Sequence, residues 1–165
     1  MHTRVLKPKH GPSLLVRPLR HGDVATVLAV FDQLSPESRR ARFNGPKPCL
    51  SIQELTQLAA VDDRHHALVA YLEGDPRPIA IARLARESRT SAEIAFAVAD
   101  AYQQRGIGVA LAAELIADAR AAGITEITAL TSSDNPAALA LLRRTTSVID
   151  VRPEGPDLSI RAAIA

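Results

Sequence analysis

Apolar residues form several short runs along the chain, and in most of them large apolar side chains alternate with small or polar ones. Runs of this kind, bounded by glycine, proline or charged residues, are typical of β-strands. They predict strands at residues 14–18, 66–72, 79–85, 92–99, 124–131, 147–151 and 158–163. Turn sequences at Gly74-Asp75-Pro76 and Glu87-Ser88 leave only short connections between the second, third and fourth strands, which favours an antiparallel meander.

Other segments carry apolar residues three and four positions apart, which is the spacing of one face of an α-helix. They predict helices at residues 23–34, 51–60, 109–122 and 136–144, with a further short helix that begins at Ser35-Pro36-Glu37. Ser51 and Glu54 have the spacing of a capping box, and Pro36 suits the first turn of a helix. The predicted order is a strand, helices, three strands, a helix, a strand, a helix and two strands.

The segment Gln103-Gln104-Arg105-Gly106-Ile107-Gly108 lies between an apolar strand and an alanine-rich helix. Two glycines spaced by one residue let the backbone turn sharply and approach a ligand closely. The helix that follows offers the unpaired amides of its first turn to an anion. The segment therefore predicts a phosphate-binding loop in which a pyrophosphate would fit.

Two other phosphate-binding motifs share glycines with this segment, but the neighbouring residues match neither. A dinucleotide-binding fingerprint needs a third glycine and an acidic residue about twenty positions later. Val109 and Leu111 follow instead, and Glu126 lies on the wrong side of a second strand. A Walker A loop needs Lys and then Ser or Thr after its last glycine, where this chain has Val109 and Ala110.

The motif formed by Gln103, Gly106 and Gly108 resembles the acetyl-CoA loop of the GCN5-related N-acetyltransferase (GNAT) superfamily. The strand at 92–98 and the helix start at 134–138 stand where that superfamily has its other cofactor elements. The resemblance covers essentially the whole chain. It implies an α/β protein of GNAT fold, with a mixed, mostly antiparallel central sheet flanked by helices and a splayed parallel strand pair that holds the cofactor. We expect a tail at residues 1–12 and one GNAT domain at residues 13–165.

The resemblance also implies which residues hold acetyl-CoA, the co-substrate. Backbone groups at the strand end would hold the pantetheine arm and the acetyl carbonyl, and amides of the loop and first helical turn would hold the pyrophosphate. Asn135 precedes Pro136 and is predicted to cap a helix, and the matching Asn of GNAT proteins also lies beside the pantetheine. The expected cofactor-binding residues are Phe96, Ala97, Val98, Gln103, Gln104, Arg105, Gly106, Ile107, Gly108, Val109 and Asn135.

Glu93 is the one charged residue in an apolar strand, and alternation places it on the face opposite Ile94. An ammonium acceptor must lose a proton before it attacks a thioester, so a carboxylate at this position could serve as general base. The strand pattern equally allows a solvent-edge Glu paired with Arg83 or Arg86. The resemblance favours the base, because Glu93 falls where bacterial protein lysine acetyltransferases have their general-base glutamate.

The segment at residues 34–39, with Arg42-Phe43 after it, is similar to an early segment in the catalytic domains of those enzymes. Some of them are joined to cyclic-nucleotide-binding domains, for which this chain has no room. The chain departs from the GNAT pattern at Leu142, where many members have a Tyr that protonates the departing thiolate, and at Thr146-Ser147, which replaces Gly-Phe. A thiol with a pKa near 8.5 leaves tolerably without that acid, so water could serve.

Composition narrows the range of partners. A length of 165 residues suits one domain, and a net charge of +2 with 3% aromatic residues makes nucleic acid an unexpected partner. Cys49 is the single cysteine, which excludes an intrachain disulfide and a thiolate zinc site. His65 and His66 would point to opposite faces of a strand, so no metal is implied. No run of residues resembles a signal peptide or a membrane span, so we expect a cytoplasmic protein without a membrane partner.

These features together predict an acetyl-CoA-dependent N-acetyltransferase that acts on a primary amine by direct attack, with Glu93 as general base. The acceptor that the resemblance favours is the ε-amine of a protein lysine. A small-molecule amine acetyltransferase is a second prediction, and a non-catalytic acyl-CoA-binding regulator, suggested by Leu142 and the altered turn, is a third. The protein is expected to be a monomer or a homodimer.

Overall fold

One pair of neighbouring strands in the middle of the sheet runs parallel, and every other neighbouring pair runs antiparallel. The computed structural model describes residues 2–164, and Val148 by its backbone alone. The strands follow the order β1-β2-β3-β4-β5-β6-β8-β7, with β5 and β6 as the parallel pair. Their bounds are β1 Arg4–Leu6, β2 Leu14–Pro18, β3 His65–Leu72, β4 Pro78–Arg86, β5 Ser91–Val98, β6 Glu126–Ser132, β7 Val148–Glu154 and β8 Asp157–Ala163. The predicted mixed, mostly antiparallel sheet is confirmed.

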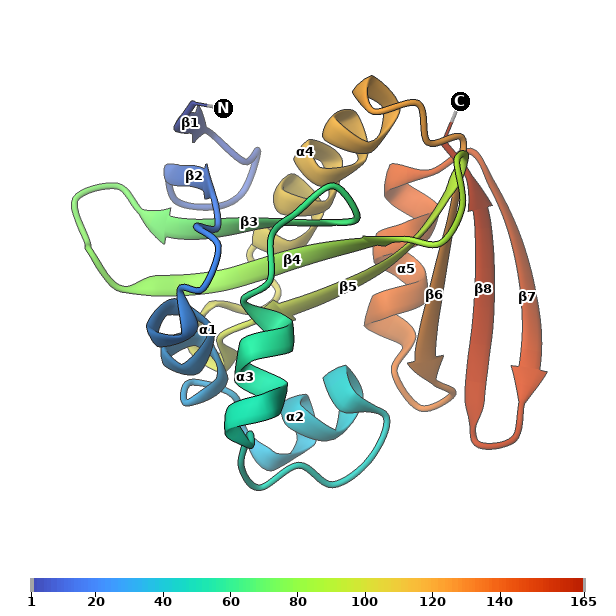
Figure 1. The fold of residues 1–165 in the computed structure, drawn as a ribbon, viewed down its shortest axis with the longest axis horizontal. Coiled ribbons are helices and arrows are strands. Elements are labelled where there is room, and N and C mark those ends of the chain that lie inside the picture. Colours follow the sequence, from blue (N-terminus) through green and yellow to red (C-terminus); the bar gives the residue numbers. More distant parts are fainter. Residues whose placement is uncertain (1, 165) are drawn as a thin grey trace.

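Helices cover both faces of the sheet (Figure 1). They are α1 Val24–Phe31, α2 Pro36–Phe43, α3 Ile52–Leu58, α4 Ile107–Ala121 and α5 Pro136–Thr145, with a 3-10 turn at Asp100–Tyr102. The first three helices lie on one face, and α4 and α5 pack on the other. Each helix lies within or close to a range that the sequence predicts.

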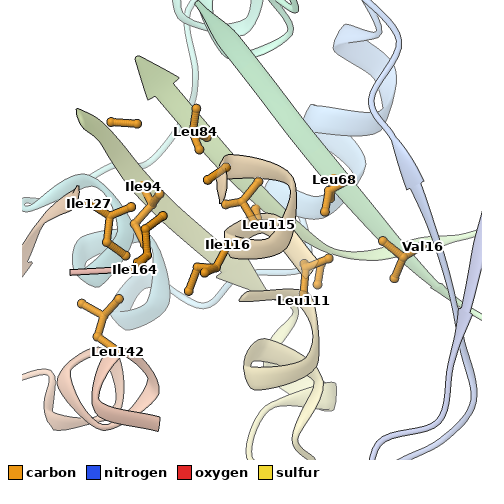
Figure 2. Close-up of a cluster of buried hydrophobic side chains, with 14 of the residues drawn as sticks. Val16, Leu68, Leu84, Ile94, Leu111, Leu115, Ile116, Ile127, Leu142 and Ile164 are labelled. Carbon is orange, nitrogen blue, oxygen red and sulfur yellow. The ribbon is translucent and has the colours of Figure 1, made fainter. Parts of the chain in front are cut away.

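Two apolar cores lie on the two faces of the sheet. The larger one joins strand residues such as Leu68 and Ile94 to Leu115 of α4 and Leu142 of α5 (Figure 2). The smaller one packs α1 and the segments around it against strand residues that include Ala97. Because side chains alternate along a strand, β5 contributes Ile94 to the first core and Ala97 to the second.

Local side chains cap the starts of α2, α3 and α5, where the sequence predicts helix starts. Ser35 accepts a hydrogen bond from the Ser38 amide at the start of α2, and Ser51 and Glu54 form a complete capping box at the start of α3. Asn135 caps α5 with Pro136 in the first turn. These contacts satisfy amides that have no partner within the helix, so the helix starts are determined over a few residues of sequence.

The expected tail at residues 1–12 contains a strand that composition did not reveal. Arg4–Leu6 pair antiparallel with β2 as the edge strand β1. Arg4 also donates hydrogen bonds to Glu114 at 2.7 Å and to Asp118 at 2.6 Å, both on α4. A strand of three residues carries little pattern of its own, and here it is held by a neighbouring strand and by ion pairs to α4. Among residues 2–164, no helix combines the length and the apolar character that crossing a bilayer requires.

Candidate active site

The parallel strands β5 and β6 pair at one end and separate toward the other (Figure 1). Their register covers Ser91, Ala92 and Glu93 of β5 and stops there. The Ala99 amide donates to the Ile79 carbonyl of β4 at 2.8 Å. Because hydrogen-bonded pairs alternate along an antiparallel ladder, the backbone groups of Phe96 and Val98 point away from β4, into the gap beside β6. In the β5–β6 register, Glu93 is the last paired residue of β5 before the two strands diverge.

The loop that leads into α4 presents backbone amides at the same end of β5. Gly106 precedes the helix in the left-handed region, with φ of 76°, and no side chain caps the helix. Gln104 is also left-handed, with φ of 58°. The first-turn amides of α4 are thus left for an anion, and the positive end of the helix dipole favours one. This geometry fits the diphosphate group of acetyl-CoA.

The two glycines of the loop have different roles. Gly106 supplies the left-handed turn, as the motif predicts. Gly108 has ordinary helical geometry, and a Cβ atom there would lie 3.1 Å from Leu141 Cδ1 of α5. Gly108 therefore allows α5 to lie close to the first turn of α4, and the prediction that both glycines serve the sharp turn is corrected for this one.

The predicted cofactor residues differ in which of their groups they expose. Val98, Gln103 and Asn135 lie around the gap, where Gln103 Nε2 donates to the Val98 carbonyl at 3.0 Å. The Asn135 side chain accepts from the Ala138 amide at 3.4 Å. By contrast, Ala97 and Ile107 turn their side chains into the two cores, so only their backbone groups remain for a ligand. The side chains of Phe96 and Val109 are half-buried, and those of Gln104 and Arg105 are exposed.

The segment between β1 and β2 lies against the phosphate loop. A Cβ atom on Gly11 would come within 2.3 Å of the Arg105 carbonyl oxygen, and a Cβ atom on Gly106 would lie 3.8 Å from Pro8. The sequence assigned this segment to a tail, because contacts nearly a hundred residues apart leave no local pattern. The segment between β1 and β2 thus contacts the loop, and the glycine motif alone does not predict this contact.

An open hollow of about 570 Å³ lies on the face of the sheet that carries α1 to α3. The strands β3 to β5 form its floor and the helices α2 and α3 form its walls. Its lining residues are Arg42, Phe43, Glu54, Gln57, Leu58, His65, Arg83, Ala85, Glu93, Ile94 and Ala95. Sequence reasoning identified Glu93 here but missed the rest as a site, because they come from five separate elements.

Glu93 is exposed on the floor of this hollow. Within residues 2–164 its carboxylate takes part in no hydrogen bond and no ion pair. Arg83 instead donates to the Leu58 carbonyl, and Arg86 donates to the carbonyls of Arg89 and Ala122. The alternative of a structural Glu paired with either arginine is therefore not what the structure shows.

Three charged side chains of the hollow have a shifted pKa. The side chain of Lys47 and the backbone and hydroxyl of Ser51 lower the pKa of Glu54 to about 2. Burial, together with the nearby charge of Arg83, lowers the pKa of Arg42 to about 10, while Glu93 acts in the opposite direction. Burial also lowers the pKa of Arg83. Glu54 and Arg42 therefore keep their charge at neutral pH.

Leu142 stands at the position of the missing Tyr. Its apolar side chain is 2% exposed and belongs to the larger core. Thr131, near the end of β6, has a buried hydroxyl without a hydrogen-bond partner in the described part of the chain. His65 contacts Asp62 and His66 contacts Asp118 of α4, so the two rings lie on opposite faces, as alternation predicts.

Comparison with known proteins agrees with this geometry. A sequence model described as the acetyltransferase (GNAT) family matches residues 29–146. Acetyltransferase Pat of Mycolicibacterium smegmatis is 36% identical over 142 residues, which cover 84% of this chain and 42% of that protein. Acetyltransferase PA5475 of Pseudomonas aeruginosa is 33% identical over 131 residues, covering 77% of this chain and 70% of that protein. The crystal structure of the GNAT domain of S. lividans PAT superposes with a TM-score of 0.86 at 25% identity, over 98% of this chain and 96% of that one. The chain thus spans less than half of the mycobacterial relative.

Proposed function

Because the chain belongs to the acetyltransferase (GNAT) family and is on that ground an acetyl-CoA-dependent N-acetyltransferase domain, we propose that its acceptor is the ε-amine of a protein lysine. Glu93 is the proposed general base. One observation carries this assignment: an unpaired carboxylate lies on the floor of an open hollow, at the residue where β5 and β6 separate. A carboxylate committed to a structural ion pair would not be available to a substrate.

The residues around the gap are suited to hold acetyl-CoA, which supplies an activated thioester carbonyl. The first-turn amides of α4 bind the diphosphate, since the left-handed Gly106 leaves them without a cap. The backbone groups of Phe96 and Val98 that face the gap offer hydrogen bonds to the pantetheine arm, as a neighbouring strand would. Asn135 lies at the start of α5, on the β6 side of the gap. In this assignment, most of the recognition comes from backbone groups.

Glu93 supports catalysis by taking the proton from the acceptor. A lysine ε-ammonium has a pKa near 10.4, so only a small fraction is nucleophilic at neutral pH. The carboxylate removes that proton directly or through a water molecule, and the neutral amine then attacks the thioester carbonyl. Its exposed position leaves room for either route. Water protonates the leaving thiolate, because Leu142 is apolar and buried.

The shape and charge of the hollow favour a lysine on a protein over a small polyamine. The hollow is open, and Arg42 and Arg83 outnumber the one free acid, Glu93, because Glu54 is already paired with Lys47. A polycation would be bound better by an enclosed acidic pocket. Relatives of this chain include a protein named acetyltransferase Pat, and a domain of S. lividans PAT superposes on it. The segment at residues 34–43, which resembles protein acetyltransferase domains, includes α2, and Arg42 and Phe43 of this helix line the hollow.

The test compares acceptors directly. The protein is incubated with acetyl-CoA and either a mixture of cytoplasmic proteins or a panel of small amines that includes spermidine. Acetyl-lysine is mapped by mass spectrometry and thiol release is measured. We expect lysine sites whose labelling depends on the enzyme and is lost with Glu93→Gln. Rapid acetylation of a small amine with only enzyme-independent protein labelling would contradict the proposed acceptor, and acetyl-CoA binding without turnover on any amine would support the regulator.

A further inference from the structure

Arg42 has an unusual environment for a half-buried cation. It lies in the last turn of α2 and lines the hollow that contains Glu93. Across the part of the chain that the structure describes, its guanidinium donates no hydrogen bond and forms no ion pair. The guanidinium instead lies over the ring of Phe43, with Arg42 Cζ 4.8 Å from the ring centroid. The five N–H donors of an arginine therefore remain open to whatever enters the hollow.

The surroundings of Arg42 do not neutralise it. The second arginine, Arg83, commits a guanidinium nitrogen to the Leu58 carbonyl and adds a positive charge nearby. Glu54, on the wall of the hollow, is held by Lys47 and by the capping box of α3. Among the residues that line the hollow, Glu93 is the one acid without a partner, and it is the group that the acceptor amine needs. Asp62, outside this lining, also opposes the charge of Arg83. Burying a cation without a partner is unfavourable, so an anion brought by the ligand would be stabilising here.

We propose that Arg42, with Arg83 behind it, binds a carboxylate of the acceptor protein, so that favoured lysines have an Asp or Glu close by in the sequence. The inference rests on the proposed function, because it assigns the second half of the acceptor site. A planar guanidinium matches a carboxylate with two parallel hydrogen bonds. The lysine amine would then be directed to Glu93 and its acidic neighbour to Arg42, so that two opposite charges in one hollow orient the acceptor.

Arg42 would act as a specificity residue, with a defined kinetic signature. Losing a hydrogen bond to a charged group corresponds to about a 10- to 100-fold change. Replacement of Arg42 by Gln should therefore lower kcat/KM on acid-flanked lysines by about that factor and leave neutral-flanked lysines nearly unchanged. Because Arg42 makes no hydrogen bond within the described chain, the variant should fold normally. Circular dichroism and acetyl-CoA affinity check that it does.

The experiment measures kcat/KM on lysine peptides that differ at one position. Asp, Asn or Lys is placed in turn at each of the three positions on either side of the acceptor lysine. Wild type is compared with Arg42→Gln, with Arg42→Lys, and with Arg40→Gln as a matched control, because Arg40 is exposed on the same helix and does not line the hollow. We expect wild type and Arg40→Gln to prefer Asp at one or more positions by about tenfold or more, Arg42→Gln to lose the preference, and Arg42→Lys to keep part of it.

The outcomes separate this inference from the function on which it rests. Equal rates on Asp and Asn peptides with wild type, or an unchanged preference in Arg42→Gln, would overturn the carboxylate subsite while leaving lysine acetylation intact. If no lysine peptide were acetylated although a small amine was, the proposed acceptor itself would be wrong, and the subsite would fall with it. The comparison of Asp and Asn on wild type decides the question even if an Arg42 variant were unstable.

Discussion

The proposed active site has a cofactor side and an acceptor side, and these two sides are built in different ways. The cofactor side uses backbone groups of a short continuous segment, residues 103–109, together with the free edge of β5. The acceptor side uses side chains from α2, α3, β3, β4 and β5 that are brought together around a hollow. The diphosphate of acetyl-CoA is the same for every acceptor, so backbone amides suffice. An acceptor has to be distinguished from others, which requires side chains of particular charge and shape.

The largest effect should come from Glu93, the acceptor-side residue that we propose as general base. Glu93→Gln keeps the shape of the side chain and removes the base, so kcat should fall by roughly 10²- to 10⁴-fold. The deficit should shrink as the pH rises toward the pKa of the amine, because more acceptor is already neutral. Acetyl-CoA affinity should stay nearly the same. Steady-state kinetics over a pH series test this.

The matched control for that variant is Glu73→Gln, in the exposed turn between β3 and β4. It makes the same chemical change outside the hollow, so its kcat should equal that of wild type. A Glu93→Gln protein with wild-type turnover at neutral pH would assign Glu93 a structural role instead.

A second prediction concerns the cofactor side. Gly108→Glu places a carboxylate in the first turn of α4, where the diphosphate should bind. Like charges in one interface cost several kcal/mol, so acetyl-CoA affinity should fall by about 100-fold or more. Calorimetry measures the affinity, and circular dichroism reports whether the fold is retained.

Gly108→Ala separates charge from packing in that experiment. Both substitutions add a Cβ atom 3.1 Å from Leu141 Cδ1, the mobile end of a side chain that can shift by a few tenths of an ångström. Alanine should therefore leave most of the acetyl-CoA affinity. Equal losses in the two variants would indicate that Gly108 matters for the contact between α4 and α5 rather than for the phosphate.

A third prediction concerns the close approach of the N-terminal segment at Gly11 to the predicted phosphate loop at Arg105. Gly11→Ala would bring a Cβ atom within 2.3 Å of the Arg105 carbonyl oxygen, so the loop or the segment has to move. A misplacement of about 1 Å can cost about 100-fold in rate. Because the segment and the loop can share the movement, we expect a roughly tenfold or greater loss of acetyl-CoA affinity. Gly45→Ala is the control, because nothing lies within 4 Å of its Cβ position. Unchanged affinity in Gly11→Ala would show that the segment does not position the loop.

The smallest effect should be a pH-dependent change in the stability of the fold at Glu54, on the wall of the hollow. The pKa of Glu54 is lowered to about 2, chiefly by the hydrogen bond from Lys47. A carboxyl group with a lowered folded-state pKa stabilises the protein above its ordinary pKa near 4.5, and that contribution is lost as the pH falls toward 2. Glu54→Gln should therefore unfold at a slightly lower temperature than wild type at pH 7. The difference should narrow below pH 4.5, and a difference that stays constant with pH would contradict the assignment.

Most of the fold could be predicted from the sequence, because the interactions that determine its elements are local. Ser51 and Glu54 cap α3 across three residues, and Asn135 caps α5 in the same way. Alternation along residues 92–98 correctly placed Glu93 and Ile94 on opposite faces. The turn at the predicted phosphate loop is also local, since a left-handed glycine before a helix is a property of consecutive residues.

The proposed acceptor half of the site was decided by the tertiary structure. Sequence spacing gives no reason why Arg42 of α2 should face the hollow beside Glu93 of β5, and it allowed Glu93 a structural pairing with Arg83 or Arg86. Arg83 bonds to Leu58 only because α3 packs over β4, and Arg4 reaches α4 across more than a hundred residues. Such contacts depend on how strands and helices pack, because side chains that meet across a sheet share no spacing along the chain.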